Sequence, residues 1–475
     1  MNRIVEISNP TRLIAERDHN DGSYVLLGKT TRTLVSFLLL ALLPYLLPGL
    51  GRLRILPAST VFGTSAKESG RESVSQAANL KLDTGVAATE VETTPGEVED
   101  LSGHALENFF KALHSTETTE AQTRVCHYGD SPITNDGITS TVRRKLQLRF
   151  GDAGHGFVLA ARPWAWYQHA GVYHEAAGSW NIDPMFISKG DHLFGLGGAS
   201  FTADSTSASA SFGTAEDGEV GRLVSTFDTY FLVQPGGGDF EIDIDGVPQA
   251  RVSTNGESVK SSFHEVRVPK GSHRMTLKPA GNGEVRIFGV ALETDGRGVQ
   301  YDSLGVNGAF IGLLAHYIDE QHWAEQLRHR RPDLVVIGYG ANESQFERLP
   351  MDQYEKDTRE VIRRIRSALP DVSILFVGPM DRGERGAGGK VVTRPMIKKL
   401  IASQRRIAAE NECAFFDTFT AMGGEGTVAK WREARPRLMG GDFTHPTAQG
   451  SEIVGTLIYD AMMRAYEQYK ERRQH

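Results

Sequence analysis

Apolar, strand-like runs alternate with helical patterns in the final third of the chain, and this alternation constrains the fold more than any other feature. The runs at 334–340 (LVVIGYG) and 373–379 (SILFVGP) are short and almost wholly apolar. Helix-like patterns cover 319–332 and 354–369. Continuous apolar runs are typical of strands buried on both faces, and strands that alternate with helices favour a parallel sheet between two layers of helices. We therefore expect a three-layer α/β domain.

The same pattern begins earlier in the chain. A strand-like run at 125–128 leads into Gly129-Asp130-Ser131, and Ile138, Val142 and Leu146 recur at helical spacing within TSTVRRKLQLRF. A strand, a tight turn and a helix form the opening unit of an α/β layer. Gly, Asp and Ser also end strands as ordinary turn residues. Ser131 is therefore either a turn residue or a nucleophile at the edge of the sheet.

A different pattern separates these two regions. From about 157 to 298 the chain is rich in Gly, Ser and Thr and contains alternating runs such as FEIDIDG and EVRIFGVALE, with turn signals at short intervals. This pattern is typical of an antiparallel sandwich or jelly roll. The sequence thus predicts an α/β domain in two parts, 104–155 and 298–475, interrupted by an all-β, jelly-roll-like insertion at 156–297.

The N-terminal region predicts a membrane anchor and a tether. Residues 34–51 form an uncharged run of about the length that spans a hydrocarbon core, and basic residues flank it. We favour an uncleaved anchor within 1–55 over a cleaved signal peptide, because no early start or small-x-small cleavage site is visible. Residues 56–103 are polar and nearly free of aromatics, which indicates a flexible linker. We expect an envelope location, with an inner-membrane anchor and the catalytic domain in the periplasm or outside.

Composition narrows the possible partners and cofactors. The formal net charge of −7 argues against nucleic acid, which needs clustered Lys and Arg. Neither His174-Glu175 nor His264-Glu265 is followed by the histidine that completes H-E-x-x-H, so the sequence predicts no metal site and no cofactor.

Two polar segments supply partners for a serine nucleophile. A serine hydroxyl needs an imidazole to accept its proton and an acceptor that fixes the imidazole tautomer. Asp442 and His445 lie three apart in GGDFTHPTAQG, although Asp442 is equally suited to capping that turn. Asn342 follows the buried run at 334–340, where its amide can donate to an oxyanion, and Gly308 offers a bare backbone N–H.

These motifs resemble the four blocks of the SGNH (GDSL-type) hydrolases. The blocks in this chain are Gly129-Asp130-Ser131, Gly308, Gly340-Ala341-Asn342 and Asp442-x-x-His445, in the family's order. Glu343 stands where many members have Asp, and Pro132 stands where Leu is usual. These two departures affect the assignment of subfamily and substrate more than the assignment of chemistry.

The resemblance implies a role for each matching residue. Ser131 is the nucleophile, His445 the general base and Asp442 the residue that orients His445. The oxyanion hole consists of the Ser131 and Gly308 backbone N–H groups and the Asn342 side chain.

The overall layout is closer still to bacterial peptidoglycan O-acetylesterases. In that group an SGNH domain is interrupted by an insert that resembles a carbohydrate-binding jelly roll. The resemblance implies removal of O-acetyl groups from a cell-envelope polysaccharide, with peptidoglycan as the favoured substrate. Two alternatives remain: an O-acetyltransferase that uses the same site, and a glycan-binding protein with a vestigial site.

Aromatic residues gather where the insertion begins. Trp164, Trp166, Tyr167 and Trp180 are candidates for stacking against sugar rings, although aromatic residues more often belong to a core. Of these, Trp164, Trp166 and Tyr167 are the candidate substrate-binding residues. His127, two residues before Gly129, is interpreted as a core histidine, and Asp130 as a brace for the turn that carries Ser131.

Overall fold

The computed structural model describes residues 91–164, 166–188 and 190–474. These residues belong to one compact unit, 75–475. The predicted anchor at 34–51 lies outside the described residues. Within the described ranges, no helix is long and apolar enough to cross a membrane.

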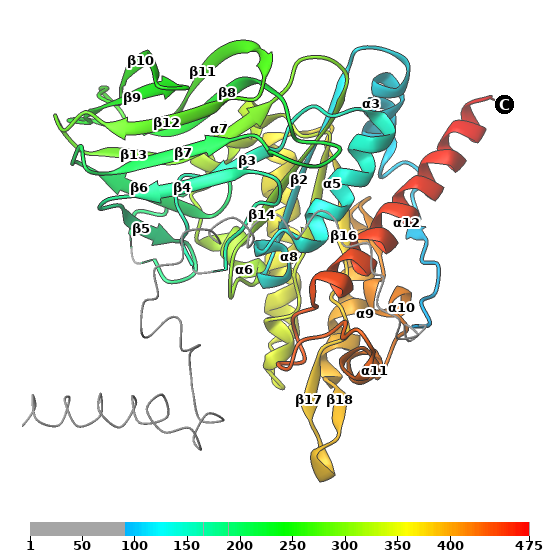
Figure 1. Cartoon of the computed structure of the whole chain (residues 1–475). Helices are drawn as coiled ribbons and strands as arrows, with labels where there is room; N and C mark the ends of the chain where they lie inside the picture. The colour runs from blue at the N-terminus through cyan, green and yellow to red at the C-terminus, as the bar shows by residue number, and fades with distance from the viewer. Residues whose placement is uncertain (1–90, 165, 189, 475) are drawn as a thin grey trace, which may run out of the picture. The chain divides into compact units, whose positions relative to one another are not determined.

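Six strands form the sheet of the α/β domain (Figure 1). In spatial order they are β1 (Val98–Glu99), β19 (Ala414–Phe416), β16 (Ser373–Val377), β15 (Leu334–Gly338), β2 (Gln122–Gly129) and β14 (Gly298–Gly305). The five strands from β19 to β14 run parallel, as expected from their apolar runs. The sheet is nevertheless mixed, because β1 pairs antiparallel with β19. Residues 98–99, which belong to the expected flexible linker at 56–103, are thus a strand of the sheet.

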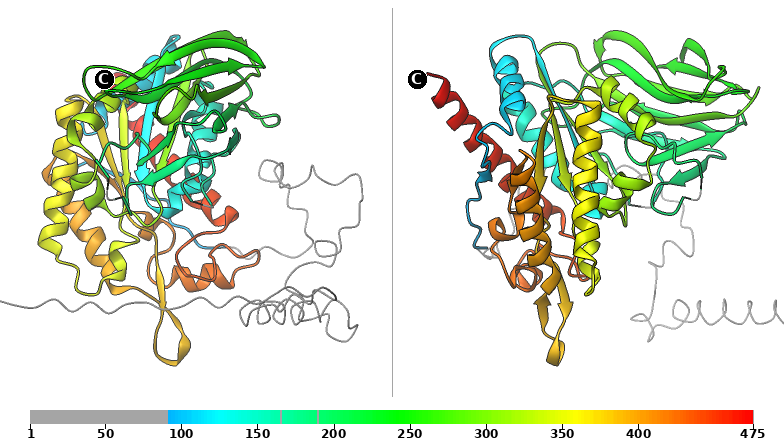
Figure 2. Two further views of the ribbon diagram at one scale, coloured as in Figure 1. Left: turned by 90° about the vertical axis from the view of Figure 1, so that its left-hand side faces the viewer. Right: turned by 180° about the vertical axis from the view of Figure 1, so that it is seen from behind.

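Helices cover both faces of this sheet. One face carries α3 (Glu107–Thr118), α5 (Gly137–Phe150) and α12 (Ala448–Gln474). The other carries α6 (Ile311–His316), α7 (Glu320–Arg330), α8 (Met351–Ala368) and α9 (Pro395–Glu410). Seen from behind, the red α12 and the yellow α8 lie on opposite sides of the strands (Figure 2).

The alternation of side chains along β15 shows how the three layers are held. Leu334 and Val336 pack into the core shared with α3, α5 and α12, whereas Val335 and Ile337 pack into the core shared with α7, α8 and α9. All four are fully buried, which explains why the sequence pattern is continuous and not alternating.

Short elements complete the α/β domain. They are α4 (Ser131–Thr134), η2 (Glu343–Gln345), β17 (Gly383–Arg385), η3 (Ala387–Gly389), β18 (Val391–Thr393), α10 (Thr418–Ala421) and α11 (Thr427–Glu433). The β17–β18 hairpin extends away from the body of the domain (Figure 1).

Eleven strands between α5 and β14 form two antiparallel sheets, called the sandwich below. They are β3 (Gly156–Leu159), β4 (Tyr173–Ala177), β5 (Asn181–Pro184), β6 (Ala199–Ala203), β7 (Ser209–Gly213), β8 (Val224–Val233), β9 (Asp239–Ile244), β10 (Val247–Ser253), β11 (Lys260–Gly271), β12 (Arg274–Pro279) and β13 (Val285–Glu293). One sheet has the order β10-β9-β12-β7-β4, and the other β11-β8-β13-β6-β5, with β3 also paired to β13. Along β9, Phe240, Ile242 and Ile244 point inward, as the alternating pattern predicts.

A buried ion pair within the α/β domain also contacts the sandwich. Arg330, at the end of α7, donates two hydrogen bonds to Asp302 of β14, at 2.7 and 2.9 Å. It also contacts Glu293 at the end of β13. Asp302 in turn accepts the backbone N–H of Phe157 of β3 at 2.8 Å. Both charged side chains of the Arg330–Asp302 pair are at most 1% exposed, so each relies on its partner to replace water.

Replacing Arg330 with Met should therefore destabilise the protein strongly. The variant leaves the Asp302 carboxylate buried without its cation, which typically costs about 3–5 kcal/mol. Urea denaturation would measure the change in free energy of unfolding. Arg359→Met removes an exposed pair with Glu410 and should cost at most about 1 kcal/mol. Similar losses in both variants would contradict a structural role for the Arg330–Asp302 pair.

Candidate active site

Three neighbouring parallel strands end at the same level of the sheet. Gly129 of β2 lies opposite Gly305 of β14 on one side and opposite Gly338 of β15 on the other. The loops that follow carry Ser131, Gly308 and Asn342 within four residues of these ends. The carboxyl edge of an open parallel sheet is where such folds bind ligands.

The structure brings the three predicted triad residues together. Oγ of Ser131 lies 2.7 Å from Nε2 of His445, and Nδ1 of His445 lies 2.6 Å from Oδ2 of Asp442. Ser131 begins α4, and the other two occupy the loop before α12. Ser131 is 6% exposed, whereas the His445 side chain is 40% exposed, so the site opens to solvent on the histidine side.

Asp442 holds both its own loop and the histidine ring. Its Oδ1 accepts the backbone N–H groups of Thr444 and His445, at 3.0 and 3.1 Å, while Oδ2 faces the ring. The capping role and the orienting role considered from the sequence therefore coexist. Partial burial favours the neutral acid, but the hydrogen bonds from His445 and the backbone outweigh it and lower the pKa of Asp442. The carboxylate therefore remains ionised at neutral pH.

Three N–H donors lie on the loops around Ser131. Among the described residues, no acceptor is bonded to the backbone N–H of Ser131 or of Gly308. Nδ2 of Asn342 donates one hydrogen bond to the carbonyl of Ala309 at 2.7 Å, which leaves its second N–H for a ligand. Gly308 has a φ of +74°, a conformation that favours glycine. The predicted oxyanion residues thus lie on adjoining loops.

Glu343 links two of these loops, a role that the sequence did not indicate. Its side chain is 3% exposed, and Oε1 accepts the backbone N–H of Ile311 at 2.9 Å. Asn342 and Glu343 on one loop thereby hold the segment from Ala309 to Ile311 on the other. From the sequence, Glu343 was notable only because it stands where many SGNH hydrolases have Asp.

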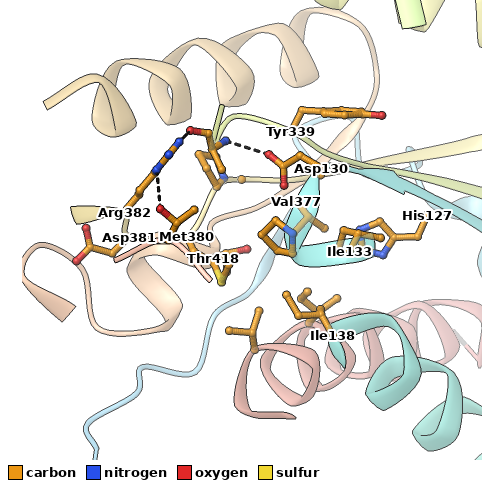
Figure 3. Close-up of a pocket in the computed structure, with 18 residues that line it drawn as sticks. His127, Asp130, Ile133, Ile138, Tyr339, Val377, Met380, Asp381, Arg382 and Thr418 are labelled. Carbon is orange, nitrogen blue, oxygen red and sulfur yellow. Dashed lines mark hydrogen bonds between the residues drawn. The ribbon is translucent and has the colours of Figure 1, made fainter. Parts of the chain in front are cut away.

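Asp130 and Arg382 form a second brace (Figure 3). Oδ2 of Asp130 accepts the backbone N–H of Ala341 at 3.2 Å, as expected for a residue that braces the nucleophile turn. Arg382 donates to the carbonyl of Ala341 and, through Nε, to Oγ1 of Thr444 at 3.0 Å. Arg382 therefore joins the Asn342 loop to the loop of Asp442 and His445. It lies far from every motif in the sequence, which is why only the structure identifies it.

Burial of these two carboxyls has an electrostatic consequence. Burial, with a contribution from the neighbouring Glu343, raises the pKa of Asp130 from 3.8 to about 8. Burial also raises the pKa of Glu343 from 4.5 to about 7, although several backbone N–H groups oppose the shift. Both carboxyls thus hold protons in a pH range where exposed carboxyls are ionised.

The pocket drawn in Figure 3 lies behind the nucleophile turn. Its lining includes Asp130, Pro132 and Thr444 but neither Ser131 nor His445. His127, which also lines it, is completely buried, and its Nδ1 lies 2.8 Å from the hydroxyl of Tyr301. Burial lowers the pKa of His127 to about 3, so it is a neutral core histidine, as predicted.

The three candidate substrate-binding aromatics occupy different environments. Trp166 is 52% exposed, and its Nε1 donates to Oδ1 of Asn307, next to Gly308, at 3.3 Å. Trp164 is half-buried and packs edge-on against Phe186, with ring centroids 6.5 Å apart. The prediction that Tyr167 binds substrate is wrong. Tyr167 is 3% exposed, and its hydroxyl accepts the backbone N–H of Leu159 at 2.9 Å, so its ring belongs to the core.

Phe186 was missed by the sequence analysis. A Cβ placed on Gly308 would lie 3.4 Å from its ring, so Phe186 borders the predicted oxyanion hole. Nothing in the sequence connects Phe186 with residue 308, because the sandwich fold alone brings them together.

Comparison with protein families identifies the domain. Residues 276–453 match the model of the GDSL-like Lipase/Acylhydrolase family. This match confirms the resemblance inferred from the four motifs. No curated protein matches the chain.

One solved structure shows that the fold is shared. A structure described as "Peptidoglycan O-acetylesterase in action, 5 min" superposes with a TM-score of 0.66 at 23% identity, covering 78% of this chain and 99% of that one. A carbohydrate esterase family 3 structure from Talaromyces cellulolyticus gives a TM-score of 0.26 at 14% identity, covering 37% and 74%. The acetyl xylan esterase AlAXEase gives 0.26 at 19%, covering 33% and 78%.

The raised carboxyl pKa values predict how stability depends on pH. Between the ordinary and the raised pKa, the folded state binds a proton that the unfolded state has lost, so stability falls as pH rises. The window is 4.5 to about 7 for Glu343 and 3.8 to about 8 for Asp130. Glu343→Gln and Asp130→Asn keep an acceptor oxygen but cannot titrate. Each should reduce the loss of unfolding free energy between pH 5 and pH 8, by up to about 1.4 kcal/mol per pH unit within its window.

Urea denaturation at both pH values measures this effect. Glu257→Gln, which removes an exposed carboxyl of the sandwich, should keep the wild-type pH dependence. If Glu343→Gln and Asp130→Asn also keep it, the two buried carboxyls do not hold protons as described.

The family match and the arrangement of donors, imidazole and hydroxyl at the sheet edge lead to one assignment. The chain is a carboxylic ester hydrolase, and its residues 276–453 match the GDSL-like Lipase/Acylhydrolase family.

Proposed function

We propose that this enzyme is an acetylesterase that removes O-acetyl groups from a cell-envelope polysaccharide, and that its substrate is peptidoglycan. The observation that carries the proposal is the continuous chain of contacts from Ser131 through His445 to Asp442. The shared fold of the peptidoglycan O-acetylesterase structure supports the choice of substrate, because the match spans 99% of that chain.

In the proposed mechanism the Ser131 hydroxyl donates its proton to Nε2 of His445 as Oγ attacks the acetyl carbonyl carbon. Nδ1–H of His445 donates to Oδ2 of Asp442, which fixes the tautomer that leaves Nε2 free to accept. The ionised Asp442 stabilises the imidazolium that forms. His445 then returns the proton to the departing sugar oxygen, and the acetyl group remains on Ser131.

The second half of the reaction releases acetate. Nε2 of His445 accepts a proton from water, and the water oxygen attacks the acetyl-enzyme. The proton returns to Oγ of Ser131 as the acyl bond breaks. In both halves the negative carbonyl oxygen is stabilised by the N–H groups of Ser131 and Gly308 and by the Asn342 amide; a single such donor typically contributes about 10²–10³ in rate.

Aromatic residues from the sandwich supply a surface for the sugar. Trp166 and Phe186 are both partly exposed beside Gly308, and Trp164 packs against Phe186. Flat apolar rings bind the C–H face of a sugar while leaving its hydroxyl groups to polar partners. We propose that these three residues, in place of the buried Tyr167, contact the glycan.

An O-acetyltransferase would use the same nucleophile and base. The difference lies in whether water or a sugar hydroxyl attacks the acetyl-enzyme. The partial exposure of His445 favours water as the acceptor. Transfer of acetyl to an added glycan in preference to water would identify a transferase instead. A protein that binds glycan but has no hydrolytic activity would identify a vestigial site.

Ser131→Ala should abolish acetate release from O-acetylated peptidoglycan, reducing the rate by at least about 10⁴-fold, because loss of the nucleophile disables the triad as a unit. Acetate release by the wild type and the variant is the measurement. Ser258→Ala removes an exposed serine of the sandwich and should keep the wild-type rate. A wild type that cleaves an aryl acetate but releases nothing from peptidoglycan would contradict the substrate and leave the esterase site intact.

We also propose an envelope location, which is supported by the uncharged run at 34–51. The full chain should sediment with membranes, and a chain that begins after residue 55 should remain in the supernatant. Equal partitioning of the two chains after ultracentrifugation would contradict an uncleaved anchor.

A further inference from the structure

A second pocket lies on the sandwich, outside the candidate active site. Residues 161 and 162, which follow β3, form one part of its lining, and residues from β4, β5 and the turn between them form the rest. The side chains that define its chemistry are those of Arg162, His174, Glu175, Trp180 and Ile182. We propose that this pocket binds a second sugar residue of the same polysaccharide whose acetyl group lies at Ser131. The inference rests on the proposed function and adds a subsite to it.

Trp180 provides a fixed apolar surface in this pocket. Its ring is half-buried against the sandwich core, and its Nε1 donates to the carbonyl of Ser209 at 3.0 Å. Since the only polar atom of the indole is already bonded, the exposed part of the ring offers apolar contact alone. Ile182, 36% exposed, extends that contact. A sugar ring, with its C–H groups on one face, suits this kind of surface.

Arg162 and Glu175 provide the polar groups. Arg162 is exposed, and its guanidinium makes no hydrogen bond or ion pair with any residue that the structure describes. Its five N–H groups are therefore available as donors to hydroxyl oxygens. Glu175 is exposed as well and accepts the hydroxyl of Tyr173 through Oε2, so Oε1 can accept a sugar hydroxyl. One donor group and one acceptor group beside a flat apolar ring match a hydroxylated ligand.

The charge of the pocket also favours a sugar over a strong anion. Burial, reinforced by the nearby Arg162, lowers the pKa of His174 to about 4, although a backbone carbonyl opposes the shift. His174 is therefore neutral at pH 7, and its ring stacks on Phe212. The remaining charges, Arg162 and Glu175, are of opposite sign and cancel.

Two segments connect this pocket to the mouth of the active site. Arg162 lies two residues before Trp164, which packs against Phe186. Ile182 lies four residues before Phe186, so their Cα atoms are at most about 14 Å apart. Phe186 borders Gly308. The two chain segments that line the pocket are thus the ones that lead to Trp164 and Phe186.

This continuity is the reason for assigning the pocket to the same glycan chain and not to a separate small molecule. In Figure 1, β5 lies at the lower end of the sandwich. A polymer held at Ser131 would extend past Phe186 and Trp164 toward Trp180. The enzyme should therefore prefer long substrates to short ones.

The test compares two substrates with full-length variants. The substrates are soluble O-acetylated peptidoglycan fragments of several disaccharides, and 4-nitrophenyl acetate. Arg162→Ala and Trp180→Ala should each lower the ratio of kcat/KM on the fragments to kcat/KM on the aryl acetate by about tenfold, mainly through KM. Arg162 is exposed and unpaired among described residues, so its removal does not threaten folding. Arg267→Ala, on the exposed strand β11, is the matched control and should keep the wild-type ratio.

A binding measurement separates failure of this inference from failure of the proposed function. In a Ser131→Ala background, calorimetry with de-O-acetylated fragments should show binding that weakens about tenfold on adding Arg162→Ala or Trp180→Ala. That result supports the pocket even if the wild type releases no acetate from the polymer. The inference is overturned if the affinity is unchanged in the variants, if no binding is detected, or if the kinetic ratio is unchanged. Acetate release by the wild type would still support the proposed function in each of these cases.

Discussion

The register of three parallel strands determines where the active site lies. Hydrogen bonding places the last residues of β14 and β15 level with Gly129 at the end of β2. Three loops therefore leave the sheet from one line, and each carries one part of the candidate site: the Ser131 hydroxyl, the Gly308 backbone N–H and the Asn342 side-chain amide. A shift of one residue in either pairing would turn every side chain of the shifted strand to the opposite face.

Buried polar groups then hold these loops to one another. Glu343 and Asn342 connect the loop after β15 to the loop after β14. Asp130 and Arg382 connect it to the turn of Ser131 and to the loop of His445. Burying two carboxyls costs stability, as their raised pKa values show. In return the backbone around the reacting atoms is held by short, directional contacts, which preorganised electrostatic catalysis requires.

The sandwich contributes to the site through the position at which it interrupts the chain. It leaves the α/β domain after α5 and returns through β13 into β14, the strand beside β2. The buried Arg330–Asp302 pair and the Phe157 N–H fix this junction. Because β14 leads directly to Gly308, the part of the sandwich that bears Trp166 and Phe186 lies beside Asn307 and Gly308. The insertion thereby supplies the aromatic residues that we propose contact the substrate.

Much of the α/β domain and of the candidate site could be predicted from local sequence patterns. The apolar runs at 334–340 and 373–379 and the helical spacing after Ser131 led to the parallel strands and their helices, since burial on two faces leaves a continuous apolar signature. The motifs containing Ser131, Asn342 and His445 led to the chemistry, because a serine nucleophile requires those partners. The antiparallel pairing of β1 was not visible, since a two-residue strand has no periodicity.

Only the tertiary structure determined the burial and the roles of residues whose partners are distant in sequence. Tyr167 and Trp166 are neighbours with the same aromatic character, yet one is core and the other lies beside Gly308, because burial depends on packing and not on residue type. Phe186, Glu343 and Arg382 belong to no motif, and their roles follow from contacts between loops that only the folded sheet brings together. The sequence by itself specified which chemical groups this enzyme contains; the register of the sheet and the packing of the sandwich decided which of them meet.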